Sequence, residues 1–235
     1  MFEIKIKITT VSCCLIGNQT ESFSIGGVDQ STTIDENGKP IIHGSAFKGA
    51  FRNIVREREK RNKELTQIKD YVKHLTEEAL KKYNSKDIQK TEKIEKMLLN
   101  LEEKARNPKA EYIFGMEGVN GMPRLFCSDF RVSKSEDKQK DGYFLIDTKN
   151  NLEEKDGEIL SNPRTYRVIK PGVEFEGTVR FYNQLEEAKE IETTIKEELE
   201  EVLKEFNNGL YGIGNSKSRG YGQVKVEIID YDKKG

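Results

Sequence analysis

The chain has 235 residues, of which 34% are hydrophobic and 34% are charged, and it contains no tryptophan. Its 40 lysines and arginines nearly balance 41 aspartates and glutamates. This balance excludes a uniformly basic nucleic-acid-binding protein, so any such surface must come from local charge. Three cysteines without a zinc-type Cys/His spacing exclude a disulfide framework and a zinc site. No apolar run approaches the roughly 18 residues of a membrane span, so we expect a cytoplasmic protein without a membrane segment.

The N-terminal residues alternate between apolar and polar side chains. Phe2, Ile4, Ile6 and Ile8 are separated from one another by charged residues. A period of two is typical of a strand that packs one face on a core. The pattern predicts a strand over residues 2–16.

Residues 23–43 combine a flexible loop with a turn. Gly26 and Gly27 precede Asp29, which places a carboxylate on a loop with few backbone restrictions. Asp35 precedes the turn-forming sequence of residues 37–40, and we interpret it as a turn-forming residue.

A helix is predicted from Gly44 and Ser45 onward. Apolar residues recur there at helical spacing, namely Ala46, Phe47, Ala50, Phe51, Ile54 and Val55. The first turn of a helix offers unpaired N–H groups, and a phosphate could bind them with Lys48 and Arg52 close by. The simpler interpretation is an ordinary helix that Ser45 caps.

Residues 56–109 form a charged, locally basic region. Its apolar residues keep helical spacing, which predicts two helices separated near residues 84–85 and ending at residues 107–108. Because so much of this region is charged, we expect a helical insertion that forms a solvated hairpin packed on itself.

The middle of the chain alternates between strand and loop signals. Residues 124–132 predict one strand that contains Asp129, and residues 149–163 look like a loop with few apolar anchors. Residues 133–165 are therefore a candidate for a mobile hairpin or arm. Extended structure is predicted over residues 164–182, with a break at 171–172 and one apolar face made of Val173, Phe175, Gly177, Val179 and Phe181.

An acidic amphipathic helix is predicted over residues 184–206, and a glycine-rich segment follows at residues 209–222. Its glycines surround the residues Ser216, Lys217, Ser218 and Arg219, before a strand at residues 224–229. Such a loop brings backbone N–H donors and cations close to a ligand, which suits phosphates. The sequence matches neither a Walker A loop nor a dinucleotide fingerprint, and a plain turn between helix and strand is the alternative.

Several of these segments, in this order, resemble the RAMP superfamily of CRISPR-associated proteins. The resemblance is carried by IGGVD at residues 25–29, by GKPIIHGSAFKGAFR at 38–52, by IFG and RLFCSDFRV within 113–132, and by GIGNSKSRGYG at 212–222. Within the superfamily, the chain is most similar to the backbone subunit of type III effector complexes. One departure is His43, because the family usually has proline before the Gly-Ser pair.

The resemblance implies an α+β fold with a ferredoxin-like or RRM-like core. In that core, helices cover one face of an antiparallel sheet. It also implies a single RAMP domain over residues 1–235, with the helical insertion at 56–109 and a thumb-like hairpin at about 133–165.

The same resemblance implies a function. Subunits of this kind stack as a filament with other subunits of the effector complex, bind guide CRISPR RNA and cleave bound single-stranded target RNA. The RNA-binding positions would be Ser45, Lys48 and Arg52 together with Ser216, Lys217, Ser218 and Arg219. The family's cleaving aspartate falls on Asp29, which would act with Mg²⁺ or another divalent cation.

Two other functions fit the same residues. One is an RNA-binding scaffold subunit without catalysis, because a single aspartate makes a small active site. The other is a metal-independent endoribonuclease that processes CRISPR RNA, with His43 as general acid or base. Dependence on a metal ion would separate target cleavage at Asp29 from processing by His43.

Overall fold

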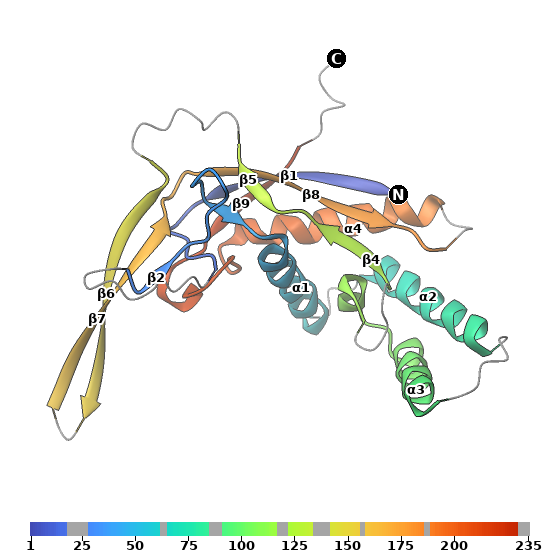
Figure 1. Cartoon of the computed structure of the whole chain (residues 1–235). Helices are drawn as coiled ribbons and strands as arrows, with labels where there is room; N and C mark the ends of the chain where they lie inside the picture. The colour runs from blue at the N-terminus through green and yellow to red at the C-terminus, as the bar shows by residue number, and fades with distance from the viewer. Residues whose placement is uncertain are drawn as a thin grey trace, which may run out of the picture. The chain divides into compact units, whose positions relative to one another are not determined.

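The computed structural model describes residues 1–17, 28–61, 65–84, 91–116, 122–133, 142–155, 158–185 and 189–229. Figure 1 shows the strands and helices. The strands are β1 (Phe2–Thr10), β2 (Gln30–Ser31), β3 (Ile41–Ile42), β4 (Arg124–Cys127), β5 (Phe130–Val132), β6 (Phe144–Lys155), β7 (Glu158–Ile169), β8 (Glu174–Tyr182) and β9 (Val224–Ile228). The helices are α1 (Gly44–Lys60), α2 (Thr66–Asn84), α3 (Glu92–Arg106) and α4 (Lys189–Lys204), with short 3-10 turns at η1 (Ala110–Phe114), η3 (Glu205–Asn208) and η4 (Lys217–Arg219).

The main sheet has six strands in the order β3-β5-β8-β1-β9, and β4 also pairs with β8. The pairs β1–β9, β3–β5, β4–β8 and β5–β8 are antiparallel. If β4 and β5 are taken as two parts of one strand, the chain runs β1-α1-β4/β5-β8-α4-β9. This is the βαββαβ order of a ferredoxin-like core, so the predicted α+β fold class is confirmed.

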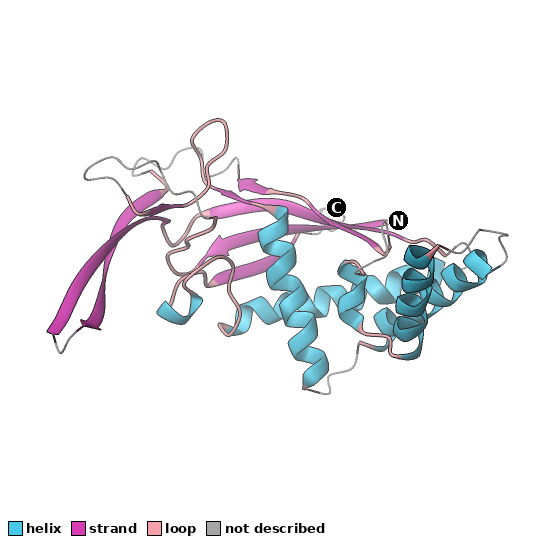
Figure 2. Ribbon diagram, turned by 60° about the horizontal axis from the view of Figure 1, so that its bottom comes forward, coloured by secondary structure: helices cyan, strands magenta, loops and turns pink. Residues whose placement is uncertain are grey.

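Aromatic side chains pack helices α1 and α2 on strands of this sheet, and Figure 2 colours the helices and the strands differently. The odd-numbered residues of strand β8 share one face, and this is the buried face of the strand. At Gly177 a Cβ would lie 2.5 Å from the Phe130 ring, and that ring packs on Phe47 of α1 with centroids 4.5 Å apart. Further along the same face of β8, the Phe181 ring packs on the Tyr71 ring of α2, with the ring centroids 5.2 Å apart. The apolar face predicted for this strand is confirmed.

The chain divides into two compact units. The first comprises residues 1–4, 51–127 and 179–203, and the second comprises 5–50, 128–178 and 204–235. Strands β1 and β8 and helix α1 each contribute residues to both units. Within the second unit, the core includes Phe47, which stacks on Phe206 at 5.7 Å as well as on Phe130.

The helical insertion differs from its prediction. Helix α2 ends at Asn84 and α3 ends at Arg106, as expected, but α2 is part of a core and does not pack only on α3. Its buried residues include Tyr71, which contacts Phe181 of β8. At the start of α2, Glu198 of α4 accepts hydrogen bonds from the Gln67 and Ile68 N–H groups at 3.0 and 2.9 Å. The amphipathic pattern had a partner outside the insertion, which local sequence does not reveal.

The arm is a long hairpin of two strands. Strands β6 and β7 pair antiparallel over their full lengths, from Phe144↔Ile169 to Lys155↔Glu158, so the loop predicted over residues 149–163 was wrong. Strand β2 adds to β7 in parallel, which makes a second, three-stranded sheet (Figure 1). At its base, the hairpin packs Tyr166 and Val168 against Leu15. The predicted arm therefore gains order from strand pairing, which needs few apolar anchors.

The first strand is shorter than the predicted 2–16. It ends at Thr10, whose hydroxyl donates to Lys170 O at 2.7 Å and accepts from the Val173 N–H at 2.9 Å. Beyond it, the backbone changes partners, with isolated bridges from Cys14 to Ile169 and from Leu15 to Asn215. Among the described residues, no helix has the length and apolar character needed to cross a membrane.

Candidate nucleic-acid interface

The glycine-rich segment at residues 212–222 forms a closed loop. The Ile213 N–H donates to Gly222 O at 2.9 Å, and the Gly222 N–H donates to Cys13 O at 2.8 Å. Gly222 has φ +81°, and a Cβ there would lie 2.3 Å from Ile213 O. Only glycine accommodates both the left-handed backbone and this close approach.

Gly214, on the other side of the loop, meets the same two constraints. Gly214 has φ +92°, and a Cβ there would lie 2.4 Å from Leu15 O. The neighbouring Asn215 N–H donates to Leu15 O at 2.8 Å, and the Asn215 side chain donates to Gly17 O at 2.9 Å. The loop is therefore anchored to the segment that follows β1.

The tip of the loop holds its cations in solvent. Ser216 adopts φ +57°, the 3-10 turn η4 covers Lys217 to Arg219, and Gly220 with φ +85° ends it. The Arg219 N–H donates to Ser216 O at 2.9 Å. Lys217, Ser218 and Arg219 are all exposed, so the rigid backbone presents two positive charges and a hydroxyl outward.

A partly buried hydrogen bond joins this loop to the arm. The Tyr221 hydroxyl donates to Asp147 Oδ2 on β6, and Tyr221 is only 5% exposed. Burial and the bond to Asp147 raise the pKa of Tyr221 well above its ordinary value. Lys149 lies 3.3 Å from Asp147 Oδ2 and 5.4 Å from the Tyr221 ring centroid. This cluster was missed from sequence because its members lie on distant segments.

Asp29 lies at the edge of the arm's sheet. Its N–H donates to Thr165 O at 2.9 Å, and its Oδ2 accepts from the Thr165 N–H at 2.5 Å. Asp29 is exposed, so its carboxylate is held in place and still meets solvent. The preceding residues 25–27 lie outside the described residues. Asp35 forms the predicted turn, because its Oδ1 accepts from the Asn37 and Lys39 N–H groups, each at 2.9 Å.

The start of α1 is capped differently from the prediction. The His43 carbonyl accepts from the Ala46 and Phe47 N–H groups, which makes His43 the N-cap residue. The side chain that caps the helix is that of Asp129. Its Oδ1 accepts a hydrogen bond from the Gly44 N–H at 2.8 Å and lies 3.6 Å from His43 Nδ1. Asp129 was predicted to lie inside a strand, and this was wrong, because it lies between β4 and β5.

This geometry bears on the predicted phosphate site at α1. Ser45 is exposed and already helical, so it is not needed as the cap. Lys48 lies one turn further along and is half-buried. Since Asp129 takes the Gly44 N–H, a phosphate at this end would have to share or replace a carboxylate.

Arg52 has a protein partner in the first unit. Its Nε lies 3.3 Å from Glu111 Oε2, and Arg56 donates to the same oxygen at 2.7 Å. Burial of Glu111 opposes its ionisation, but the two arginines outweigh burial and lower the pKa of Glu111. Arg52 therefore serves a structural ion pair, while its role in RNA binding stays a prediction.

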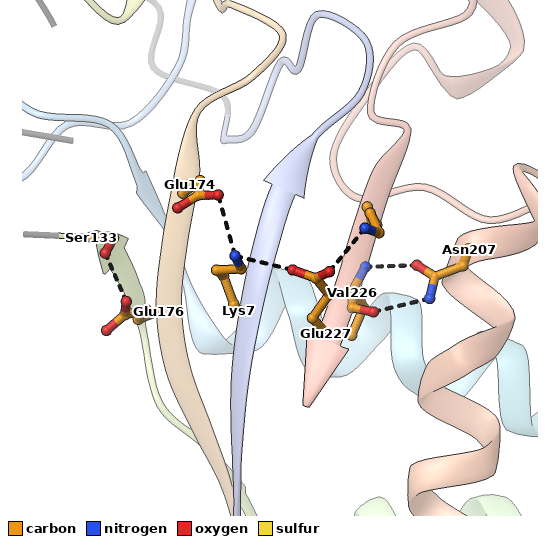
Figure 3. Close-up of polar contacts among 8 residues, drawn as sticks. Lys7, Ser133, Glu174, Glu176, Asn207, Val226 and Glu227 are labelled. Atoms are coloured by element: carbon orange, nitrogen blue, oxygen red, sulfur yellow. Dashed lines mark hydrogen bonds and ion pairs between the residues drawn. The ribbon is translucent and has the colours of Figure 1, made fainter. Parts of the chain in front are cut away.

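On the outer face of the sheet, by contrast, lysine and glutamate side chains form ion pairs with one another. Figure 3 shows Lys7 of β1 between Glu174 of β8 and Glu227 of β9, at 3.3 and 3.0 Å. Lys225 extends the row with a 2.8 Å contact to Glu227. Hydrogen bonds to Glu227 and Glu174 raise the pKa of Lys7, and those from Lys225 and Lys7 lower the pKa of Glu227. Such a row offers a phosphate chain little net attraction.

A resident metal ion is not supported by the protein's donors alone. Within the parts of the chain that the structure describes, no group of three or more His, Cys, Asp or Glu side chains is placed to hold an ion. Mg²⁺ usually keeps several waters and takes one or two carboxylates plus substrate phosphates. Asp29 fits such an ion only together with RNA oxygens and water.

Comparison with known proteins identifies the family. The profile of the RAMP superfamily matches residues 7–225 of the chain. The chain belongs to the RAMP superfamily. A search of the curated proteins found no match for this RAMP protein.

One similar solved chain comes from the cryo-EM structure of the Type III-B Cmr-beta bound to cognate target RNA. It aligns with a TM-score of 0.54 and 19% identity over 97% of the RAMP chain described here. The RAMP chain spans 60% of the length of that relative. At this identity the likeness supports the fold.

The structure brings some of the predicted site residues into one setting. Within the second unit, the loop that carries Ser216 to Arg219 is tied to the arm through Tyr221 and Asp147, and Asp29 is tied to the same arm through Thr165. The loop and Asp29 therefore share one scaffold, the base of the hairpin.

Proposed function

We propose that this RAMP protein is an RNA-binding backbone subunit of a type III CRISPR effector complex. The observation that carries the proposal is the glycine-rich loop, which is rigid in its backbone and exposes Lys217, Ser218 and Arg219. Cations on a fixed loop contact phosphates whatever the bases are, which suits a subunit that holds guide CRISPR RNA while base pairing selects the target. Its partners would be the guide, single-stranded target RNA, other subunits and further copies stacked as a filament.

The first test is RNA binding by the full chain. Salt titration of a single-stranded RNA should give a linear fall of log K with log salt, and each lost phosphate contact should flatten that slope by about 0.7. Lys217→Ala and Arg219→Ala should each flatten it. Lys225→Ala is the matched control, because Lys225 is already paired with Glu227 on the outer face. Equal slopes for all four proteins would contradict the proposed loop site.

We further propose that the assembled complex cleaves target RNA and that Asp29 is the catalytic residue. The chain's own contribution is to fix the Asp29 carboxylate at the arm through the two hydrogen bonds with Thr165. A bound Mg²⁺ would supply stabilisation of the charge that develops on the scissile phosphate. Asp29→Asn should keep RNA affinity and abolish cleavage, and EDTA should have the same effect on the wild-type complex.

The pair of His43 and Asp129 favours a second candidate function. Their 3.6 Å separation places a carboxylate beside an imidazole that is about half exposed, with side-chain exposures of 45% and 46%. Such a pair can orient a general base or acid for metal-independent RNA processing. Cleavage that persists in EDTA and disappears in His43→Ala would select this function, and absence of cleavage in any metal would leave a binding scaffold.

A further inference from the structure

Two cations face each other across the arm. Lys149 of β6 and Arg164 of β7 are cross-strand partners in the hairpin, and both are exposed. Residues directly opposite on antiparallel strands point to the same face, and like charges in such a pair destabilise the hairpin. The Lys149–Arg164 pair therefore costs the hairpin stability through charge repulsion.

The neighbouring carboxylate neutralises only part of this charge. Asp147 Oδ2 lies 3.3 Å from Lys149 Nζ and also accepts the Tyr221 hydroxyl hydrogen bond. Among the described residues, no carboxylate forms an ion pair with Arg164. Two positive charges thus share one acidic group that is already engaged, and the face keeps a net attraction for an anion.

The Lys149–Arg164 pair lies on the arm next to the Asp147–Tyr166 pair and to Thr165. One step closer to the core on the same face is the pair Asp147↔Tyr166, where Tyr166 is buried against Leu15. The face therefore passes from the buried Tyr166 to two exposed cations where the arm leaves the core. Arg164 also directly precedes Thr165, the residue that holds the Asp29 main chain and carboxylate.

We propose that Lys149 and Arg164 form a phosphate-binding subsite for the RNA strand that passes Asp29. This deepens the proposed function and rests on it. The guanidinium of Arg164 suits bidentate binding of a phosphate, and the Lys149 ammonium adds a point charge. The subsite continues the cations of the glycine-rich loop, because Tyr221 of that loop and Lys149 contact the same Asp147 carboxylate.

The experiment is a salt titration of a 5′-labelled single-stranded RNA with the full chain. We compare wild type, Arg164→Gln, Lys149→Gln and the double variant, with Lys225→Gln as the control. Each single variant should flatten the plot of log K against log salt by about 0.7, and the double variant by about 1.4. Arg164→Lys keeps the charge and should keep the slope with reduced affinity.

Thermal unfolding supplies a second measurement that a merely structural role would move the other way. Because the two cations repel each other, Arg164→Gln should leave the melting temperature unchanged or raise it while it weakens RNA binding. An unchanged slope and affinity in Arg164→Gln and in the double variant, with wild-type RNA binding intact, would overturn this inference alone. Absence of RNA binding by the wild-type chain would overturn the proposed function and this inference together.

Discussion

Gly222 offers a sharp test of the claim that the glycine-rich loop depends on close backbone approach. Gly222→Ala forces a residue with a Cβ into φ +81° and places that Cβ 2.3 Å from Ile213 O. The atoms in the way belong to the Ile213 backbone, so no flexible side chain can move aside. The loop must shift and lose the hydrogen bonds from the Ile213 N–H to Gly222 O and from the Gly222 N–H to Cys13 O.

The magnitude follows from these losses. The left-handed conformation costs a residue with a Cβ roughly 1–2 kcal/mol, and two hydrogen bonds add about 1 kcal/mol each, for about 3–4 kcal/mol in total. Gly220 is the matched control, because it has nearly the same φ of +85° and nothing within 4 Å of an added Cβ. Gly220→Ala should therefore cost only the conformational part, about 1–2 kcal/mol.

Urea denaturation of both variants and wild type gives the comparison. We expect the free energy of unfolding to fall in both variants, and by at least about 1 kcal/mol more in Gly222→Ala. Equal losses in the two variants would refute the argument from close approach, because the two positions differ in steric contact and hardly in φ. A loss confined to Gly220→Ala would refute it as well.

Substitutions at three further positions test packing and capping in the second unit. Gly177→Ala should cost about 1–3 kcal/mol of unfolding free energy, since its Cβ would lie 2.5 Å from the Phe130 ring. Gly49→Ala should instead stabilise α1 by about 0.5–1 kcal/mol, because nothing lies within 4 Å of the new Cβ. A lower melting temperature for Gly49→Ala than for Gly177→Ala would contradict the packing described. Asp129→Ala should cost about 1 kcal/mol through loss of the acceptor for the Gly44 N–H, whereas Asp129→Asn keeps an acceptor and most of the stability; equal melting temperatures for wild type and Asp129→Ala would show that the cap is dispensable.

Periodicity predicted the parts of the fold that bury one continuous face. The alternation in β8 and the helical spacing in α1 and α4 were found where expected, because burial at every second or every third to fourth residue leaves a local record. The arm left no such record. Its strands carry Asn150, Asn151 and Pro163, and they are ordered by pairing with each other, which apolar periodicity does not detect.

A local sequence pattern can indicate a candidate site whose residues are consecutive, but not one whose partners are distant in the chain. The glycines and cations of residues 212–222 indicated an exposed loop from sequence alone. The cap from Asp129 to Gly44 spans 85 positions, and the bond from Tyr221 to Asp147 spans 74. A tyrosine or aspartate in isolation does not indicate its partner, so these contacts required the folded chain.

The cluster of Glu111 with Arg52 and Arg56 should make stability depend on pH in a defined direction. Burial of Glu111 raises its pKa, but hydrogen bonds and charge from the two arginines outweigh burial and lower the pKa below its ordinary value of 4.5. A carboxylate whose pKa is lower in the folded state stabilises fully above its unfolded value, and this contribution is lost as the pH falls through the folded value. Glu111→Gln should therefore cost about 1 kcal/mol near neutral pH, after allowance for the exposure of both arginines.

The same variant distinguishes an ion pair from simple packing. In urea titrations, the difference between wild type and Glu111→Gln should shrink as the pH falls below about 4, because the wild-type carboxylate is then protonated. Glu102→Gln is the control, since its pair with Arg106 is exposed, with side-chain exposures of 45% and 79% at 3.6 Å. A difference for Glu111→Gln that stays constant down to pH 3 would show that shape rather than charge holds this cluster together.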